Sequence, residues 1–109
     1  MRKITTLAVS AFAKGENFKM DNTTVKVETF EGYNVVSMYL YGNKIAERTE
    51  KDVCVCSGGY RSNTTKERLN SILSHYGLPK VSQKKGAWFY SDGKPFGDTI
   101  DSEENFHTI

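Results

Sequence analysis

The side chains of this sequence best suited to hold a metal or attack a substrate are its two cysteines and two histidines. Cys54 and Cys56 are one residue apart, so in a strand they point to the same side, whereas structural zinc sites use pairs about two to four residues apart on tight turns. A reactive cysteine needs a cation or a helix N-terminus to lower its pKa, and both cysteines lie among valines. We therefore expect two inert thiols, no metal and no cofactor.

A second possible chemistry is anion binding at residues 58–66. Gly58 and Gly59 precede an expected helix, and a glycine-rich backbone at a helix N-terminus can hold a phosphate. The P-loop spacing is absent, so the sequence favours a strand exit and a capped helix, with any small anionic ligand expected at this segment. The paired carboxylates of the chain lie on turns or in the tail without a positioned histidine or nucleophile, so we expect no catalytic activity.

Aromatic and basic side chains offer a third chemistry, which is binding to a macromolecule. Exposed aromatic rings beside lysine and arginine suit a protein contact or single-stranded nucleic acid. The sequence pI of about 8.5 is below the value of about 9 expected of a dedicated nucleic-acid binder, which favours a protein partner. The candidate binding residues are Tyr39, Tyr41, Tyr60, Arg61, Thr64, Thr65, Lys66, Lys84, Lys85, Trp88 and Tyr90.

A small set of helices and strands must position these residues. Apolar residues at the spacing of one helical stripe, followed by Gly15, predict a first helix over residues 3–14. Runs of β-branched and aromatic residues, separated by turn residues, then predict an antiparallel meander of four strands. The expected strands cover residues 24–30, 33–41, 44–49 and 53–57.

A second helix is expected over about residues 64–76. Thr64 and Glu67 have the spacing of a capping box, and Gly77 and Pro79 follow as stop signals. Two further strands are expected after this helix, at residues 81–84 and 87–91, and the chain turns again toward residues 94–96. The order α-β-β-β-β-α-β-β predicts an α+β fold in which both helices pack on one face of an antiparallel sheet.

The length and charge of the chain predict its domain organisation. With 109 residues it can form one domain with a modest core, which we expect at residues 1–97. The net charge of +2 is uneven, because basic residues concentrate in residues 58–96, where they could form a basic face that includes Arg61, Lys66 and Arg68. Residues 98–109 are predicted to be an acidic, loosely held tail in which Phe106 and Ile109 can dock. No apolar run approaches the roughly 18 residues of a membrane span, so we expect no membrane partner.

Three segments of the chain are distinctive in combination: the GNKIA turn at residues 42–46, the run GGYRSNTTKERLN at residues 58–70, and Gln83-Lys84 followed by Trp88-Phe89-Tyr90. Together they resemble a family of small accessory proteins of tailed bacteriophages and their prophages. The similarity covers most of the chain up to Phe96, and it departs from the family at Tyr60, where members often have tryptophan. The resemblance implies a phage origin and action inside a bacterial host cell.

These observations lead us to expect a non-catalytic phage accessory protein in the cytoplasm of the infected bacterium. We expect it to bind a host protein, as an inhibitor of a defence factor, which includes CRISPR machinery, or of a housekeeping factor. The alternative is a nucleic-acid-binding module that uses the basic and aromatic residues of the second half. A homodimer is also compatible with the predicted meander, because exposed edge strands can pair between chains.

Overall fold

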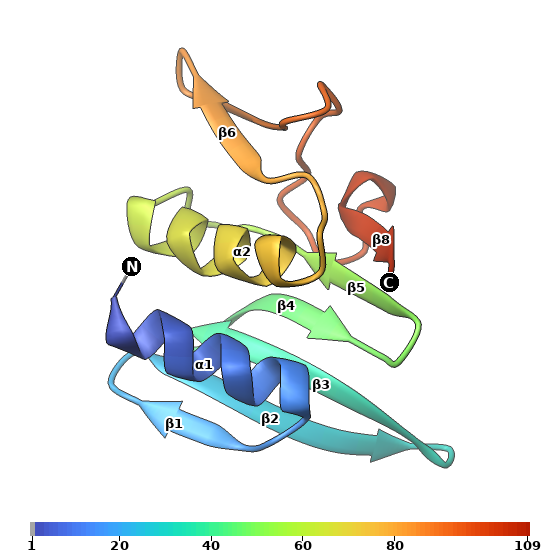
Figure 1. The fold of residues 1–109 in the computed structure, drawn as a ribbon. Helices are drawn as coiled ribbons and strands as arrows, with labels where there is room; N and C mark the ends of the chain where they lie inside the picture. Colours follow the sequence, from blue (N-terminus) through green and yellow to red (C-terminus); the bar gives the residue numbers. More distant parts are fainter. Residues whose placement is uncertain (1) are drawn as a thin grey trace.

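The computed structural model describes residues 2–109, so residue 1 of the expected domain lies outside it. Its main feature is a six-stranded antiparallel sheet with the strand order β1-β2-β3-β4-β5-β8 and two helices on one face (Figure 1). A separate hairpin, β6-β7, packs beyond the second helix. The elements are α1 (Lys3–Lys14), β1 (Phe18–Met20), β2 (Thr23–Phe30), β3 (Tyr33–Leu40), β4 (Asn43–Arg48), β5 (Asp52–Val55), α2 (Asn63–His75), β6 (Val81–Lys84), β7 (Ala87–Tyr90), the 3-10 turn η1 (Glu103–Asn105) and β8 (Phe106–Thr108). The predicted α+β class and element order are confirmed, and β1 and β8 are strands that sequence reasoning missed.

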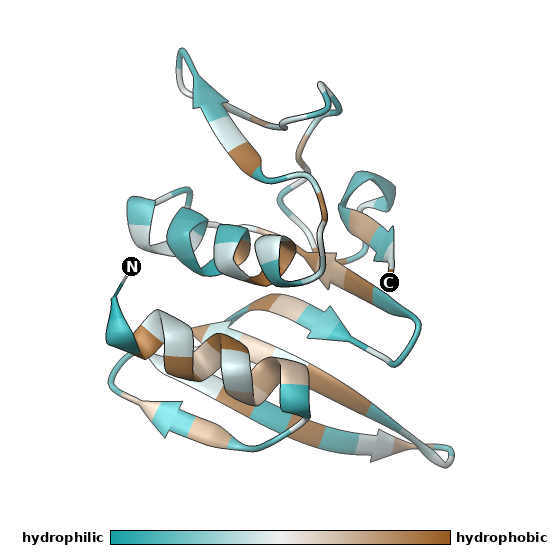
Figure 2. Cartoon of the chain, in the orientation of Figure 1, coloured by the Kyte–Doolittle hydropathy of each residue, from teal (hydrophilic) through white to brown (hydrophobic). Residues whose placement is uncertain are grey.

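The core lies between the sheet and the two helices. Alternate residues of β3 point inward, and Val36 and Met38 are buried there with Phe12 of α1 and Leu69 of α2. Figure 2 shows the same pattern, in which hydrophobic residues lie on the strands and on the helix surfaces between the layers. One hydrophobic stripe on each helix therefore positions both helices on the same face.

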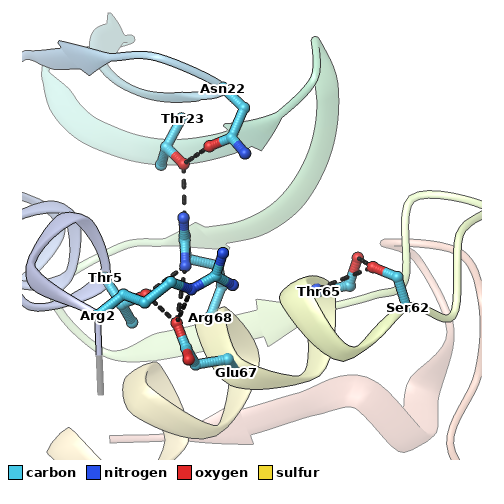
Figure 3. A network of polar contacts seen from close by, with 8 residues as sticks. All are labelled: Arg2, Thr5, Asn22, Thr23, Ser62, Thr65, Glu67 and Arg68. Atoms are coloured by element: carbon cyan, nitrogen blue, oxygen red, sulfur yellow. Dashed lines mark hydrogen bonds and ion pairs between the residues drawn. The ribbon is translucent and has the colours of Figure 1, made fainter.

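The start of α2 differs from its prediction. Ser62, not Thr64, is the N-cap, because its Oγ accepts a hydrogen bond of 3.1 Å from the backbone N–H of Thr65 (Figure 3). The helix therefore begins two residues earlier than a Thr64 cap would require. Glu67 is then too far along the helix to close a capping box, and its carboxylate contacts Arg2 and Thr5 instead.

Arg68 is fully buried, which removes it from the basic face expected at residues 58–96. Its guanidinium donates to Thr23 Oγ1 at 3.3 Å, to Glu67 Oε1 at 3.0 Å and to the hydroxyl of Thr5 (Figure 3). Arg2 donates to the same carboxylate oxygen of Glu67 at 3.1 Å. This polar network joins α1, β2 and α2 inside an otherwise apolar core, because a buried charge must keep its hydrogen-bond partners.

The C-terminal residues are held more firmly than a loose tail would be. Strand β8 pairs with β5, and the amide of Ile109 donates to Lys51 O at 2.8 Å. Asn105 is fully buried and accepts a hydrogen bond of 2.7 Å from the Tyr90 hydroxyl. The expectation of a loosely held segment was wrong because backbone pairing, which any sequence can supply, anchors it. The expected domain boundary at residue 97 stays a prediction.

Candidate functional site

The candidate site is an open pocket of about 380 Å³ where three loops meet at one end of the sheet. The β3–β4 turn contributes one wall, the chain leaving β5 contributes another, and the start of α2 closes the third side. Its volume falls at the lower end of the roughly 300–1,000 Å³ typical of ligand pockets. The lining residues are Leu40, Tyr41, Asn43, Ile45, Ser57, Tyr60, Ser62 and Thr65.

Two tyrosines stand at the rim of this pocket. Tyr41 is 75% exposed and occupies the β3–β4 turn with a positive φ of 51°, and its backbone N–H donates to Asn22 O at 2.8 Å. Tyr60 is 67% exposed and lies on the loop before α2. Two exposed tyrosines beside one apolar pocket form a larger aromatic surface than a single exposed ring, and tyrosine is enriched at the centres of protein interfaces.

Gly58 allows the chain that leaves β5 to approach the β3–β4 turn closely. It has φ of +66°, and a Cβ added to it would lie 3.1 Å from Asn43 Cβ and 3.3 Å from Lys44 O. Only glycine accepts both the left-handed backbone and this close approach without strain. Gly58 therefore lets the chain that leaves β5 pack against Asn43 and Ile45, which line the pocket.

The expected anion site at residues 58–66 is occupied by a carboxylate of the chain itself. Asp98 Oδ1 accepts hydrogen bonds of 2.8 Å from Arg61 Nε and 2.9 Å from Ser57 Oγ. The hydrogen bond from Arg61 is the main cause that holds the pKa of the Asp98 carboxyl below its ordinary value. Asp98 therefore neutralises Arg61 beside the pocket. No local sequence signal could have found this contact, because it joins residues 37 positions apart.

The serine and threonine hydroxyls of the pocket at the start of α2 are hydrogen-bonded within the protein. Ser62 Oγ and Thr65 Oγ1 are 3.0 Å apart and hydrogen-bonded, and Thr65 is buried. Thr64, next to it, is partly exposed on the first turn of α2 and does not line the pocket. Leu40 and Ile45 form an apolar floor, which sequence reasoning missed because both are ordinary strand residues.

Trp88 and Tyr90 are not the stacking surfaces that the sequence suggested. Trp88 is 4% exposed and Tyr90 1% exposed, because β7 packs its alternate side chains into the core. The guanidinium of Arg61 and the ammonium group of Lys66 lie 5.7 Å and 5.8 Å from the centre of the Trp88 ring. These two cations cover the ring where it reaches the edge of the core. Lys66 also donates to Gln83 Oε1 at 3.1 Å, so it ties α2 to the hairpin.

The other predicted binding residues lie away from the pocket. Lys84 and Lys85 are exposed at the turn of the β6–β7 hairpin, which projects from the body of the protein (Figure 1). Tyr39 lies on the sheet face opposite the helices, between the ammonium groups of Lys26 and Lys44. The structure therefore brings Tyr41, Tyr60 and Thr65 together in the lining of one pocket, with Arg61 beside it, and separates them from Tyr39, Lys84 and Lys85.

The cysteines have the properties of unreactive thiols. Burial, with a smaller effect from Asp52, raises the pKa of Cys54 to about 11, and burial also raises the pKa of Cys56. Across residues 2–109 no three side chains of His, Cys, Asp or Glu lie close enough together to hold a metal ion. Nor does the described part of the chain contain a helix long and apolar enough to cross a membrane.

Fold and site together define a small α+β protein with an apolar surface pocket between two exposed tyrosines. The chain belongs to a family of cyanophage proteins: residues 1–108 match the family described as Kyanoviridae Gp96 protein. This confirms the resemblance to a phage protein family. No curated protein and no solved structure matches the chain.

Proposed function

We propose that this cyanophage protein acts by binding a protein of its bacterial host in the cytoplasm, without catalysing a reaction. The observation that supports this function best is the apolar pocket of about 380 Å³ rimmed by Tyr41 and Tyr60. Hot spots of protein interfaces are pockets of this kind, in which an anchor side chain loses its contact with water and aromatic residues surround it. The partner is a host-defence factor, CRISPR machinery among them, or a housekeeping factor that the phage inhibits.

The chemistry of the pocket defines the anchor that it accepts. Its floor is apolar, and the hydroxyls of Ser62 and Thr65 already bond to each other. An apolar or aromatic side chain of the partner fills such a site, with a polar group at the rim where the tyrosine hydroxyls can bond to it. An acidic anchor is disfavoured, because the Arg61 guanidinium beside the pocket already has Asp98 as its partner.

Nucleic-acid binding has less support as the alternative function. Trp88 and Tyr90 are buried, so two of the three aromatic residues that the sequence suggested for stacking in the second half are not accessible to bases, and Tyr60 is the one that is exposed. Exposed lysines remain in this half for contacts with phosphate, at Lys80, Lys84, Lys85 and Lys94. Binding through them would weaken steeply with salt, because phosphate contacts release counterions.

The test is affinity capture from cyanobacterial lysate with matched variants. Wild type is compared with the double change Tyr41→Ser and Tyr60→Ser, and with Tyr33→Ser as the control, because Tyr33 is also an exposed tyrosine but lies at the far hairpin. Capture is repeated with nuclease and at two salt concentrations. We expect one stoichiometric host protein that survives nuclease, with affinity reduced at least about 30-fold by the double change and unchanged by the control.

Two results would contradict the proposal. A host protein retained equally by the double variant would place its contact elsewhere on the molecule. Recovery of nucleic acid, lost on nuclease treatment or with Lys84→Glu and Lys85→Glu, would establish the alternative function instead.

A further inference from the structure

Neither α1 nor α2 covers the opposite face of the sheet (Figure 1), and the segment that approaches this face at Glu47 and Cys54 is residues 100–103, which lead into η1. Residues paired across antiparallel strands point to the same face, so the register identifies what this outer face displays. One row crosses the sheet from Lys26 on β2 through Ser37, Glu47 and Cys54 to Phe106 on β8. The next row includes Lys19, Thr24, Tyr39 and Lys44.

One half of the outer face is basic. The ammonium groups of Lys26 and Lys44 lie 5.4 Å and 5.8 Å from the centre of the Tyr39 ring, one on β2 and one on β4. Lys19 on the edge strand β1 lies in the same row as Tyr39. Glu28 is the acidic residue of this half, one row closer to the β2–β3 turn.

The other half of the outer face is acidic. A cavity of about 500 Å³ opens there, and Glu47, Asp101 and Glu103 contribute carboxylates to its walls. Cys54 and Phe106 supply its apolar surface, and Phe106 is 54% exposed. Lys44 Nζ lies 3.8 Å from Glu47 Oε1, which marks the boundary between the two halves near the centre of the sheet.

We propose that a second copy of this chain docks on the outer face as a two-fold symmetric dimer. A two-fold axis parallel to the strands, between β3 and β4, places β2 of each copy over β5 of the other. Lys26 of one copy then lies over the acidic cavity around Cys54 of the second copy, and the same contact repeats by symmetry. Residues 100–103 rise beside Cys54 at this end of the face, so the lysine of one copy enters the cavity that they wall in the other copy, and the two sheets lie further apart there than the roughly 10 Å of a flat sheet packing.

The distribution of charge on the outer face favours a second copy of this chain over nucleic acid or an anionic membrane. Nucleic acid and anionic lipid would be attracted by the basic half and repelled by Glu47, Asp101 and Glu103. A surface divided into a basic and an acidic half is complementary to its own copy after a two-fold rotation. This dimer is independent of the pocket at Tyr41 and Tyr60, which lies on the helix side at the end of the sheet.

The test is the oligomeric state of the full chain, measured by sedimentation equilibrium at about 0.05 M and about 0.5 M salt. We expect a dimer that weakens at high salt. Lys26→Glu and Glu103→Lys should each weaken the dimer about 100-fold, because each reversal acts at two symmetric places and costs about tenfold at each. The control is Lys84→Glu, an equal charge reversal on the projecting hairpin, which should leave the dimer intact.

Mixing the two weakened variants gives the sharper result. In the mixture, the reversed charge of the Lys26→Glu copy faces the reversed charge of the Glu103→Lys copy, and the second symmetric contact keeps the wild-type Lys26 and Glu103. The mixture should therefore form a heterodimer although neither variant dimerises well alone. A wild-type chain that is monomeric at every concentration would overturn the proposal, and so would a dimer that Lys26→Glu leaves intact. A monomer that captures a host protein, nucleic acid or anionic vesicles through Lys26 would also overturn it and assign the face to that occupant.

Discussion

Removal of Glu67 should destabilise the protein more than removal of the arginine that it neutralises. Arg68 is fully buried, whereas the Glu67 side chain is 30% exposed and also accepts from Arg2. In Glu67→Ala, the Arg68 charge stays in the core with only the hydroxyls of Thr5 and Thr23. In Arg68→Met, the charge is gone and the carboxylate that remains can reach water.

The structure supports a magnitude for each change. Removing one partner of a buried ion pair costs about 3–5 kcal/mol, and the partial exposure of Glu67 lowers this to about 2–4 kcal/mol. Replacing Arg68 by a methionine should cost about 0–2 kcal/mol, because a hydrophobic residue of similar length fills the space. The hydroxyls also keep partners, since Thr5 donates to Glu67 and Thr23 donates to Asn22 Oδ1 at 2.8 Å.

The assay is urea unfolding at pH 7 of wild type, both single variants and the double variant. The double variant should be about as stable as Arg68→Met alone, because Glu67 has no buried charge left to neutralise. The gap between the single variants corresponds to about 10 °C in melting temperature for a domain of this size. If Arg68→Met costs as much as Glu67→Ala, or if the two effects simply add, the account of this network is wrong.

The pH dependence of stability gives a second readout of the same pair. The hydrogen bond from Thr5 is the main cause that lowers the pKa of Glu67 in the folded state. A carboxyl with a lowered folded pKa stabilises the protein above its unfolded value of about 4.3, and this contribution is lost as the pH falls through the folded value. Glu67→Ala should therefore lose less stability than wild type between pH 5 and the acid transition, as measured by urea unfolding at each pH.

Three further predictions concern the pocket walls and the thiols. Ser62→Ala should cost about 1 kcal/mol in urea unfolding through loss of the N-cap, and Thr64→Ala less than half of that; the reverse order would restore the capping box expected from sequence. Gly58→Ala should cost about 1–3 kcal/mol, because its φ is +66° and its Cβ would press on Asn43, and an unchanged stability would show that the loop relaxes freely. Cys54 should react with iodoacetamide at pH 8 far more slowly than free cysteine, because its pKa is about 11, and a rate equal to that of free cysteine would contradict the burial.

Much of the fold could be predicted because its signals are local. The helical stripe before Gly15 predicted α1 with its bounds, and alternating residues separated by turns predicted the β2–β5 meander. Strands β1 and β8 have only three residues each and carry no alternation of their own, so the sequence held no signal for them. They exist because a neighbouring strand offers unpaired backbone groups.

The candidate site was predictable in part, for the same reason. Tyr41 and Tyr60 lie on turns, where large side chains stay exposed, and both are on the rim of the pocket. Trp88 and Tyr90 looked equally suited to binding, yet they are buried, because β7 packs onto α2 and the C-terminal segment. Which aromatic residues are exposed depends on contacts between distant segments, and no spacing along the chain records those contacts.

By itself, then, the sequence determined the α+β class, the meander, both helices and membership of the phage family. These follow from periodicity, turn residues and motifs that act over a few positions. Only the tertiary structure decided that Arg68 is buried, that Asp98 neutralises Arg61 and that the outer sheet face divides into a basic and an acidic half. Each of these depends on where segments tens of residues apart meet, which packing of the whole chain decides.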